Sequence, residues 1–297
     1  MKIRLGVIGS SEGNGHPYSW SAIFNGYNAN AMQHCEFPAI PDYLNKQSWP
    51  ESKIMEAEVS TIWTQDPELS ARIASASCIS HVSSSLDDLE SRVDAVLLAR
   101  DDAENHIDYA KQFLLSGKPI YIDKPIALSI TALDKLYQFQ RYSGQIFTCS
   151  ALRYSPELSL SSADKEDLGK ILEISASTPK SWEKYAVHIV EPVLKMISPR
   201  DSIYKAQLSV ILEKSQSLNI EWKSGLKTEF TTLGDVQSPI KIQIIGTKGT
   251  KVLIFKDSFM AFKLALQDFI DGIIQNECKS PIEFNKKVVK IIERGMK

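Results

Sequence analysis

The sequence predicts an α/β protein with two domains: an N-terminal domain on a parallel sheet and a C-terminal α/β domain on a large, mostly antiparallel open sheet. Three observations predict this. Strand-like and helix-like segments alternate in the first half, which is typical of parallel strands joined by crossover helices. Strand-like segments follow one another directly in the second half, as antiparallel strands do. A chain of 297 residues with 43% hydrophobic side chains is also long enough to build two cores.

The first half begins with an apolar run at residues 2–10 that we expect to be a strand. Residues 66–77 are expected to form a helix, because Asp66 can cap it and Pro67 suits its first turn. Further strands are expected at 57–65, 93–100, 119–125 and 145–152, a short strand and a helix within 79–90, and further helices at 105–115 and 129–144.

The rhythm changes near Ala151, where we place the boundary between a domain at 1–150 and a domain at 151–297. A strand at 168–179 and a helix at 188–198 are followed by several strands in succession, which favours antiparallel pairing. These strands are expected at 205–214, 217–225, 227–234, 239–247 and 251–257, and two closing helices at 261–276 and 285–295.

The composition argues against several classes of protein. The formal net charge of −2 gives no basic surface for nucleic acid or an anionic membrane. The N-terminal apolar run is too short for a signal peptide or a spanning helix, so we expect a cytoplasmic protein. The four cysteines have no CxxC spacing, which indicates neither a zinc site nor a disulfide framework.

Lys124 stands at the end of a short apolar run. Residues 120–122 favour a buried strand, and Pro125 cannot continue a central one. Ligands of open α/β sheets bind at the carboxyl ends of the strands. The residues alone therefore leave two interpretations of Lys124, a catalytic cation or a solvated loop residue.

Short segments along nearly the whole chain carry a family resemblance. In order they include LGVIGS, TQDPELSARIA, GKPIYIDKPIALS, LRYSPE, HIVE, IIGTKGT and LQDFIDGI. Together they resemble the Gfo/Idh/MocA family, which includes glucose-fructose oxidoreductase and inositol dehydrogenase; DKP stands where that family usually has E-K-P. The resemblance implies a Rossmann domain, NAD or NADP as cofactor, and hydride transfer between the nicotinamide and a sugar, polyol, sugar acid or nucleotide sugar.

The resemblance also implies roles for individual residues. Lys124 would stabilise the alkoxide that develops as hydride leaves carbon, and His188 of HIVE would exchange the hydroxyl proton. Arg153 and Lys184 would contact the substrate; Lys184 stands where many members carry an aspartate. The residues implied to bind the cofactor are Gly9, Ser10, Ser11, Gly13, Gly15, Thr64, Ala99, Arg100, Asp101, His106, Asp123, Lys124 and Pro125.

Three departures from the family pattern bear on the cofactor. The loop GSSEGNGHPYSW lacks the usual GxGxxG spacing, so we expect a remodelled phosphate-binding loop. Thr64 stands where an acid normally binds the adenosine ribose, which gives a slight preference for NADP, although no arginine follows it. About residues 28–57 form an insertion, in which Phe37, Tyr43 and Trp49 either build a wall of the site or pack an outer decoration.

The segment LARDDAENH contains Asp101, Asp102, Glu104 and His106, a group that could suggest a metal site. Acidic residues that open a helix explain the pattern better, because they complement the helix dipole and cap its N-terminus. We therefore expect no metal.

Two other functions stay open. A dinucleotide-binding regulator without activity would not need both Lys124 and His188. A glycosidase of the same family would use the cofactor transiently, without net redox change. In each case we expect a small-molecule ligand, no nucleic acid and no membrane. A homodimer or homotetramer is also expected, because the long strands of the second half expose a broad face that few helices can cover.

Overall fold

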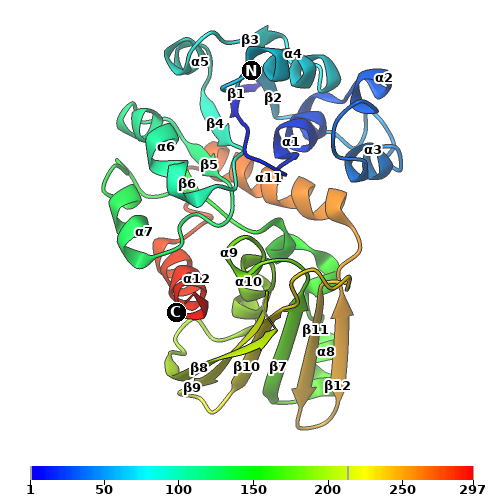
Figure 1. The fold of residues 1–297 in the computed structure, drawn as a ribbon, viewed down its shortest axis with the longest axis vertical. Helices are drawn as coiled ribbons and strands as arrows, with labels where there is room; N and C mark the ends of the chain where they lie inside the picture. The colour runs from blue at the N-terminus through cyan, green and yellow to red at the C-terminus, as the bar shows by residue number, and fades with distance from the viewer. Residues whose placement is uncertain (1, 213, 297) are drawn as a thin grey trace. The chain divides into compact units, whose positions relative to one another are not determined.

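The structure, a computed structural model, describes residues 2–212 and 214–296 (Figure 1). The chain divides into two compact units. The first unit comprises the residues up to Ile126, Asp134–Cys149 and Phe262–Pro281, and the second comprises Ala127–Leu133, Ser150–Ala261 and the residues from Ile282 onward. Ser150 thus begins the longest segment of the second unit, next to the domain boundary that the sequence suggests.

Parallel strands build the sheet of the first unit in the order β3-β2-β1-β4-β5-β6. Leu5, Val7 and Ile8 of the central strand β1 are fully buried, as expected for a parallel sheet covered on both faces. This order is that of a Rossmann fold, as predicted. The strands are β1 (Ile3–Ile8), β2 (Ala57–Trp63), β3 (His81–Val82), β4 (Ala95–Leu98), β5 (Ile120–Ile122) and β6 (Ile146–Phe147).

Helices connect these strands, and side chains at the N-cap positions of α4 and α5 satisfy some of the first N–H groups. Asp66 caps α4 by accepting from Glu68 N at 2.9 Å, and Ser85 caps α5 by accepting from Asp88 N at 3.1 Å. The helices of this half of the chain are α1 (His16–Asn25), α4 (Pro67–Ala76), α5 (Leu86–Arg92), η1 (Ala103–Asn105), α6 (His106–Leu115) and α7 (Ile130–Tyr137).

The insertion before β2 folds against the glycine-rich loop. A Cβ atom on Gly15 would lie 2.7 Å from Ile40 Cδ1 and 2.8 Å from Phe37 Cγ, so the loop needs glycine here for the insertion to approach this closely. The insertion contains two short helices, α2 (Ala29–Met32) and α3 (Ala39–Leu44).

The helix α11 (Ser258–Gln275) contributes most of its length to the first unit, although it lies far along the chain. The ring of Phe269 lies 5.7 Å from that of Tyr121 and 5.6 Å from that of Phe147, measured between centroids. A boundary after residue 150 would assign this helix to the C-terminal domain. Aromatic packing on the first sheet is the physical reason that Phe262–Pro281 belongs to the first unit instead.

The second unit is built on a mixed sheet with the order β12-β11-β7-β10-β9-β8, in which β7 and β10 are parallel and the other described neighbours antiparallel. The helix α10 packs on β7 and β11, and α12 packs on β8 and β9. This arrangement confirms the predicted fold class. The strands are β7 (Ile171–Thr178), β8 (Ile203–Leu212), β9 (Ser215–Trp222), β10 (Lys227–Thr232), β11 (Lys241–Gly246) and β12 (Thr250–Ile254). The helices are η2 (Ala151–Tyr154), η3 (Pro156–Leu158), α8 (Ser162–Leu168), α9 (Trp182–Tyr185), α10 (Val187–Met196) and α12 (Ile282–Gly295).

The two faces of this second sheet differ in polarity. Along β7, Ile174 and Ala176 are buried, whereas Glu173 and Ser175 are half-exposed on the opposite face. A hollow on that open face is lined mainly by polar and charged side chains, among them Glu173, Lys205, Glu221, Lys227 and Glu229. The homodimer or homotetramer therefore stays a prediction, since the open face is not broadly apolar.

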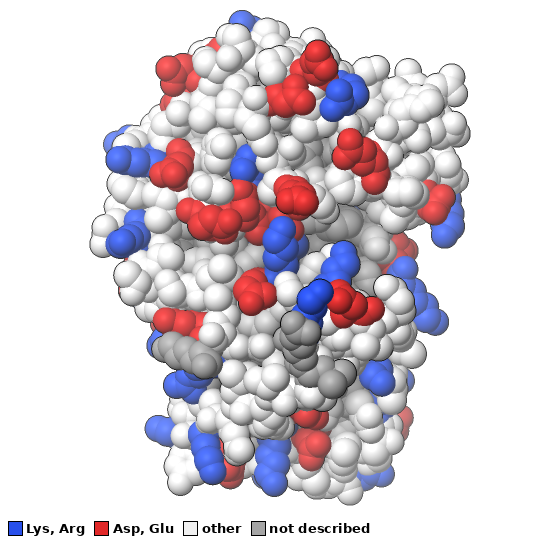
Figure 2. Space-filling view, in the orientation of Figure 1, with Lys and Arg blue, Asp and Glu red and all other residues white. Residues whose placement is uncertain are grey.

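No helix in residues 2–212 and 214–296 is long and apolar enough to cross a membrane. Figure 2 shows acidic and basic side chains mixed over the face in view rather than separated into areas of one sign. The visible surface thus agrees with the nearly balanced composition.

Trp182 of α9 packs against the C-terminal turn of α12, and this packing requires glycine at position 295. Its indole Nε1 donates to Ile292 O at 2.8 Å, and a Cβ atom on Gly295 would overlap the indole ring.

We expect Gly295→Ala to lower the free energy of unfolding by about 1–3 kcal/mol, because the overpacked ring must shift. Urea denaturation measures this. Lys290→Ala, at an exposed position of α12, should change the free energy of unfolding by less than about 0.5 kcal/mol. Equal stability of the two variants would contradict this packing.

Candidate active site

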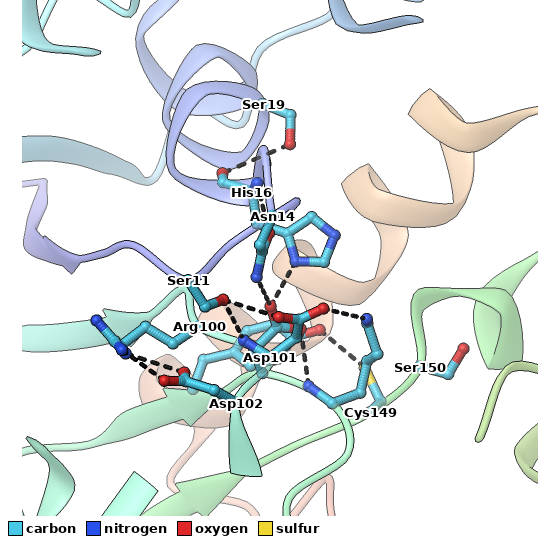
Figure 3. Close-up of polar contacts among 12 residues, drawn as sticks. Ser11, Asn14, His16, Ser19, Arg100, Asp101, Asp102, Cys149 and Ser150 are labelled. Atoms are coloured by element: carbon cyan, nitrogen blue, oxygen red, sulfur yellow. Dashed lines mark hydrogen bonds and ion pairs between the residues drawn. The ribbon is translucent and has the colours of Figure 1, made fainter. Parts of the chain in front are cut away.

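Asp123, at the carboxyl end of β5, ties the glycine-rich loop to the first sheet. Its carboxylate is fully buried: Oδ2 accepts from Asn14 Nδ2 at 2.9 Å and lies 2.5 Å from His16 Nδ1, and Oδ1 accepts from Lys124 N at 2.7 Å. In Figure 3 the side chains of Asn14 and His16 both point toward the end of the loop's contact with the sheet, as these distances require. A buried carboxylate requires such partners, so loop and strand end are fixed together.

Lys124 is held beside the same loop. It is only 6% exposed, and its Nζ lies 3.6 Å from Asp101 Oδ2. Asp101 in turn accepts from Ser11 Oγ at 2.7 Å and donates its backbone N–H to that oxygen at 3.0 Å. A buried ammonium needs a compensating charge, and Asp101 supplies it. The structure thus rules out the solvated interpretation of Lys124.

Arg100 and Asp102 form a second charged pair next to Asp101. Their Nη2 and Oδ2 atoms are 2.5 Å apart, and Nε donates to Oδ1 at 3.0 Å. Burial raises the pKa of Asp102, but hydrogen bonds from Arg100 and Asn105 outweigh it and hold that pKa below its ordinary value.

Both ring nitrogens of His106 lie within 3.0 Å of backbone carbonyl oxygens. Among the described residues, no cluster of three or more His, Cys, Asp or Glu is arranged to hold a metal.

The loop between β1 and α1 borders a pocket of about 200 Å³. The first N–H groups of α1 are bonded within the protein: His16 N donates to Asn14 Oδ1 at 2.8 Å, and Tyr18 N and Ser19 N donate to Gly15 O at 3.1 and 3.2 Å. Gly13 is exposed and has a φ of +75°, with open space where a Cβ would stand. Exposed glycine backbone that precedes a helix N-terminus is what a pyrophosphate binds, so this loop fits a dinucleotide. The described lining residues are Ser10, Ser11, Glu12, Gly13, Asn14, Pro17, Tyr18, Glu36, Phe37, Gln65, Leu69 and Ile73.

Thr64 does not line this pocket, although the family pattern places it at the adenosine ribose. It is only 3% exposed; its Oγ1 donates to Asp66 O at 2.6 Å and lies 2.9 Å from Ser70 Oγ, so its hydroxyl belongs to the start of α4. Gln65 lines the pocket instead: its Oε1 accepts from Ser10 N at 3.0 Å, and its Nε2 donates to Ser10 O at 2.8 Å. Sequence reasoning missed Gln65, because it aligned the neighbouring residue with the usual acid.

The other predicted cofactor residues surround the loop and the strand ends. Ser10, Ser11 and Gly13 line the pocket, and Gly15 precedes α1. Gly9 directly follows β1, and its N–H donates to Trp63 O at 3.1 Å. Ala99 directly follows β4, and its N–H donates to Ile8 O at 2.8 Å. Pro125 follows Lys124. Asn14 and His16 were missed, and the signal for them was the polar character of GNGHP, which a plain glycine turn does not need.

The insertion supplies part of the pocket wall. Phe37 and Glu36 line it, which favours the wall interpretation over an outer decoration. The side chains of Tyr43 and Trp49 instead pack within the insertion. Tyr43 is buried there, which raises the pKa of its hydroxyl, and Trp49 Nε1 donates to Leu44 O at 3.0 Å.

In the second unit, His188 lies at the start of α10. Its Nδ1 is 2.8 Å from Ser150 Oγ, and its ring meets that of Tyr185 edge-on, with centroids 5.1 Å apart. Ser150 also accepts from Leu152 N at 3.3 Å, so its position is fixed by the backbone.

Arg153 has a partner within its own unit. Its Nη1 lies 3.4 Å from Oε2 of Glu191, the acid of the HIVE motif, and its guanidinium lies 5.0 Å from the Phe284 ring centroid. Lys184 is half-buried on α9, about one helical turn before His188. The substrate contacts of Arg153 and Lys184 stay predictions.

Comparison with known proteins agrees with the fold. Residues 3–150 match the model of a family described as "Oxidoreductase family, NAD-binding Rossmann fold". Myo-inositol 2-dehydrogenase from Lactobacillus plantarum is similar with a TM-score of 0.72 and 12% identity, covering 100% of this chain and 96% of that one. Scyllo-inositol dehydrogenase from Lactobacillus casei with NAD(H) and scyllo-inositol gives 0.70 and 14%, covering 98% and 95%.

Biliverdin reductase from Synechocystis sp. PCC 6803, in complex with biliverdin and NADP+, has a TM-score of 0.70 and 13% identity, covering 99% of this chain and 98% of that one. At such identities the likeness of solved structures shows the fold. No curated protein compared with the chain matches it.

Glu191 gives stability a specific pH dependence. Burial raises its pKa to about 7 from an ordinary 4.5, and the Arg153 charge only partly opposes this. Between these pH values the unfolded chain ionises while the folded chain keeps the proton, so wild-type stability falls as pH rises, by up to about 3 kcal/mol. The variant Glu191→Gln has no ionisable carboxyl group at this position, so its stability does not fall with pH for this reason. Its melting temperature relative to wild type should therefore rise from pH 4.5 to 7 and then level off. A difference that is independent of pH would contradict a buried, neutral Glu191.

Proposed function

This chain belongs to the Gfo/Idh/MocA oxidoreductase family, and we propose that it is an NAD(P)-dependent dehydrogenase or reductase acting on a CH–OH group of a sugar, polyol, sugar acid or nucleotide sugar. One observation carries the proposal: a buried lysine, Lys124, stands at the carboxyl end of β5 beside the glycine-rich loop. Burying an ammonium lowers stability unless it is well paired, so a functional role explains its presence better than packing does.

The bound dinucleotide would supply the hydride acceptor or donor, held by the loop after β1 and the pocket beside it. Lys124 Nζ offers a positive charge to the substrate oxygen, and that attraction strengthens as the alkoxide develops. Asp101, 3.6 Å away, keeps the ammonium in place without a bidentate bond that would immobilise it. A substrate oxygen can therefore share this ammonium with the carboxylate.

His188 is assigned the proton transfer. Imidazole changes its protonation near neutral pH, and the Ser150 contact at Nδ1 orients the ring so that Nε2 accepts or returns the hydroxyl proton. Arg153 and Lys184 would contact substrate oxygens, and Lys184 would favour substrates that carry a carboxylate or phosphate. Lys124 and His188 belong to different units, so each role is assigned from the geometry of its own unit.

The two alternatives keep the same cofactor but differ in chemistry. A dinucleotide-binding regulator is less favoured, because it needs neither the buried Lys124–Asp101 pair nor the oriented His188. A glycosidase that uses the cofactor transiently would employ the same residues, and only its products distinguish it from an oxidoreductase.

We expect Lys124→Met and His188→Asn each to lower turnover by about a hundredfold or more, because a positioned charge or acid/base group acts mainly in the transition state. The affinity for the dinucleotide should change far less. Steady-state rates and calorimetric cofactor titrations measure both, with a substrate identified by thermal shift at saturating cofactor.

Matched controls come from exposed residues of the same types. Lys135→Met and His34→Asn should keep full turnover, because both side chains are exposed and neither lines the pocket beside the loop. Full turnover in Lys124→Met or His188→Asn would remove that residue from the mechanism.

A further inference from the structure

The pocket beside the glycine-rich loop lacks the usual acid at the end of β2. In dinucleotide-binding domains an acid there hydrogen-bonds the ribose hydroxyls of the adenosine. Thr64 occupies that position, and its hydroxyl is bonded to Asp66 O and Ser70 Oγ instead. Gln65 lines the pocket, but its amide holds Ser10 and accepts from Arg100 Nη1 at 3.2 Å. A ribose acceptor must therefore come from elsewhere.

Glu36 of the insertion is the candidate acceptor for the ribose hydroxyls. The described residues that line the pocket include two carboxylates, Glu12 and Glu36, and neither lysine nor arginine. Glu12 belongs to the glycine-rich loop itself, where the pyrophosphate would lie. Glu36 lines the pocket together with Leu69 and Ile73 of α4, the helix that follows β2. Glu36 therefore lies on the side of the pocket where the adenosine would bind.

The backbone at Glu36 is anchored on both sides. Cys35 is buried, and its thiol lies 3.5 Å from the Phe37 carbonyl. The Phe37 ring lies 6.4 Å from that of Tyr18, on α1, and packs against Gly15. An exposed carboxylate on so fixed a segment stays at the pocket wall, in reach of a bound ribose.

The charge of Arg72, a nearby cation, must be compared with that of Glu36. Burial, the largest cause, raises the pKa of the Tyr18 hydroxyl; the nearby charge of Arg72 on α4 lowers it, and that of Glu36 raises it. Arg72 is exposed and is not among the described lining residues, whereas Glu36 is. The charge that faces the pocket is therefore negative.

We propose that Glu36 replaces the missing acid after β2 and makes this chain select NAD(H) over NADP(H). The inference rests on the proposed function as a dinucleotide-dependent enzyme. A carboxylate accepts hydrogen bonds from both ribose hydroxyls, whereas a 2'-phosphate would meet a like charge. The insertion then determines cofactor choice, and the preference is opposite to the one that Thr64 alone suggests.

Calorimetric titration of NADH and NADPH into the wild type, Glu36→Gln and Glu51→Gln tests this. Wild type should bind NADH about tenfold or more tightly than NADPH, since close like charges oppose binding of the phosphate. Glu36→Gln should bring the two affinities within about threefold of each other, because it removes the repulsion of the 2'-phosphate and leaves only a neutral, weaker acceptor for the ribose hydroxyls. Glu51, exposed in the same insertion but absent from the pocket wall, is the matched control, and its variant should keep the wild-type ratio.

Two results would overturn the inference and leave the proposed function intact: wild type that prefers NADPH, as expected if Arg72 binds the 2'-phosphate, or an unchanged ratio in Glu36→Gln. Failure of the wild type to bind either dinucleotide would overturn the proposed function as well. Circular dichroism of each variant confirms that the exposed substitutions leave the fold unchanged.

Discussion

The buried carboxylate of Asp123 is the interaction on which the rest of the site depends. Without partners, a carboxylate removed from water would destabilise the fold by several kcal/mol or take up a proton. Its partners come from two segments: Asn14 and His16 of the glycine-rich loop, and the backbone of Lys124. The loop that would receive a dinucleotide and the lysine that would act on the substrate are therefore positioned by one group.

The same contacts join the irregular glycine-rich loop to the aspartate of the DKP motif. Aspartate is one methylene shorter than the glutamate of E-K-P, so polar groups must come closer to satisfy it. The irregular loop GSSEGNGHP brings an amide and an imidazole to that distance. The His16 ring is in turn stacked on Trp20, with centroids 4.8 Å apart, so α1 helps to hold it.

The fold could be predicted from the sequence because hydrophobic periodicity and turn residues act locally. The alternation around Asp66 and Pro67, for example, fixes β2 and α4 without knowledge of any distant contact. The site was less predictable, since its details depend on long-range packing. Whether Thr64 or Gln65 faces the pocket is decided by hydrogen bonds at the start of α4, and the part that Glu36 plays depends on how the insertion packs on Gly15. The pairing of Arg153 with Glu191 likewise joins residues that no local pattern relates.

Net reduction of a nicotinamide dinucleotide by a sugar or polyol tests most directly whether this protein is an oxidoreductase. The wild-type protein is incubated with oxidised cofactor and with the polyols, sugars and glycosides that raise its melting temperature, and the absorbance of reduced nicotinamide is followed while products are quantified. We expect reduced nicotinamide to accumulate in equal amount with an oxidised product. Cleavage of a glycoside without any accumulation of reduced nicotinamide would contradict this and identify the protein as a glycosidase that uses its cofactor transiently.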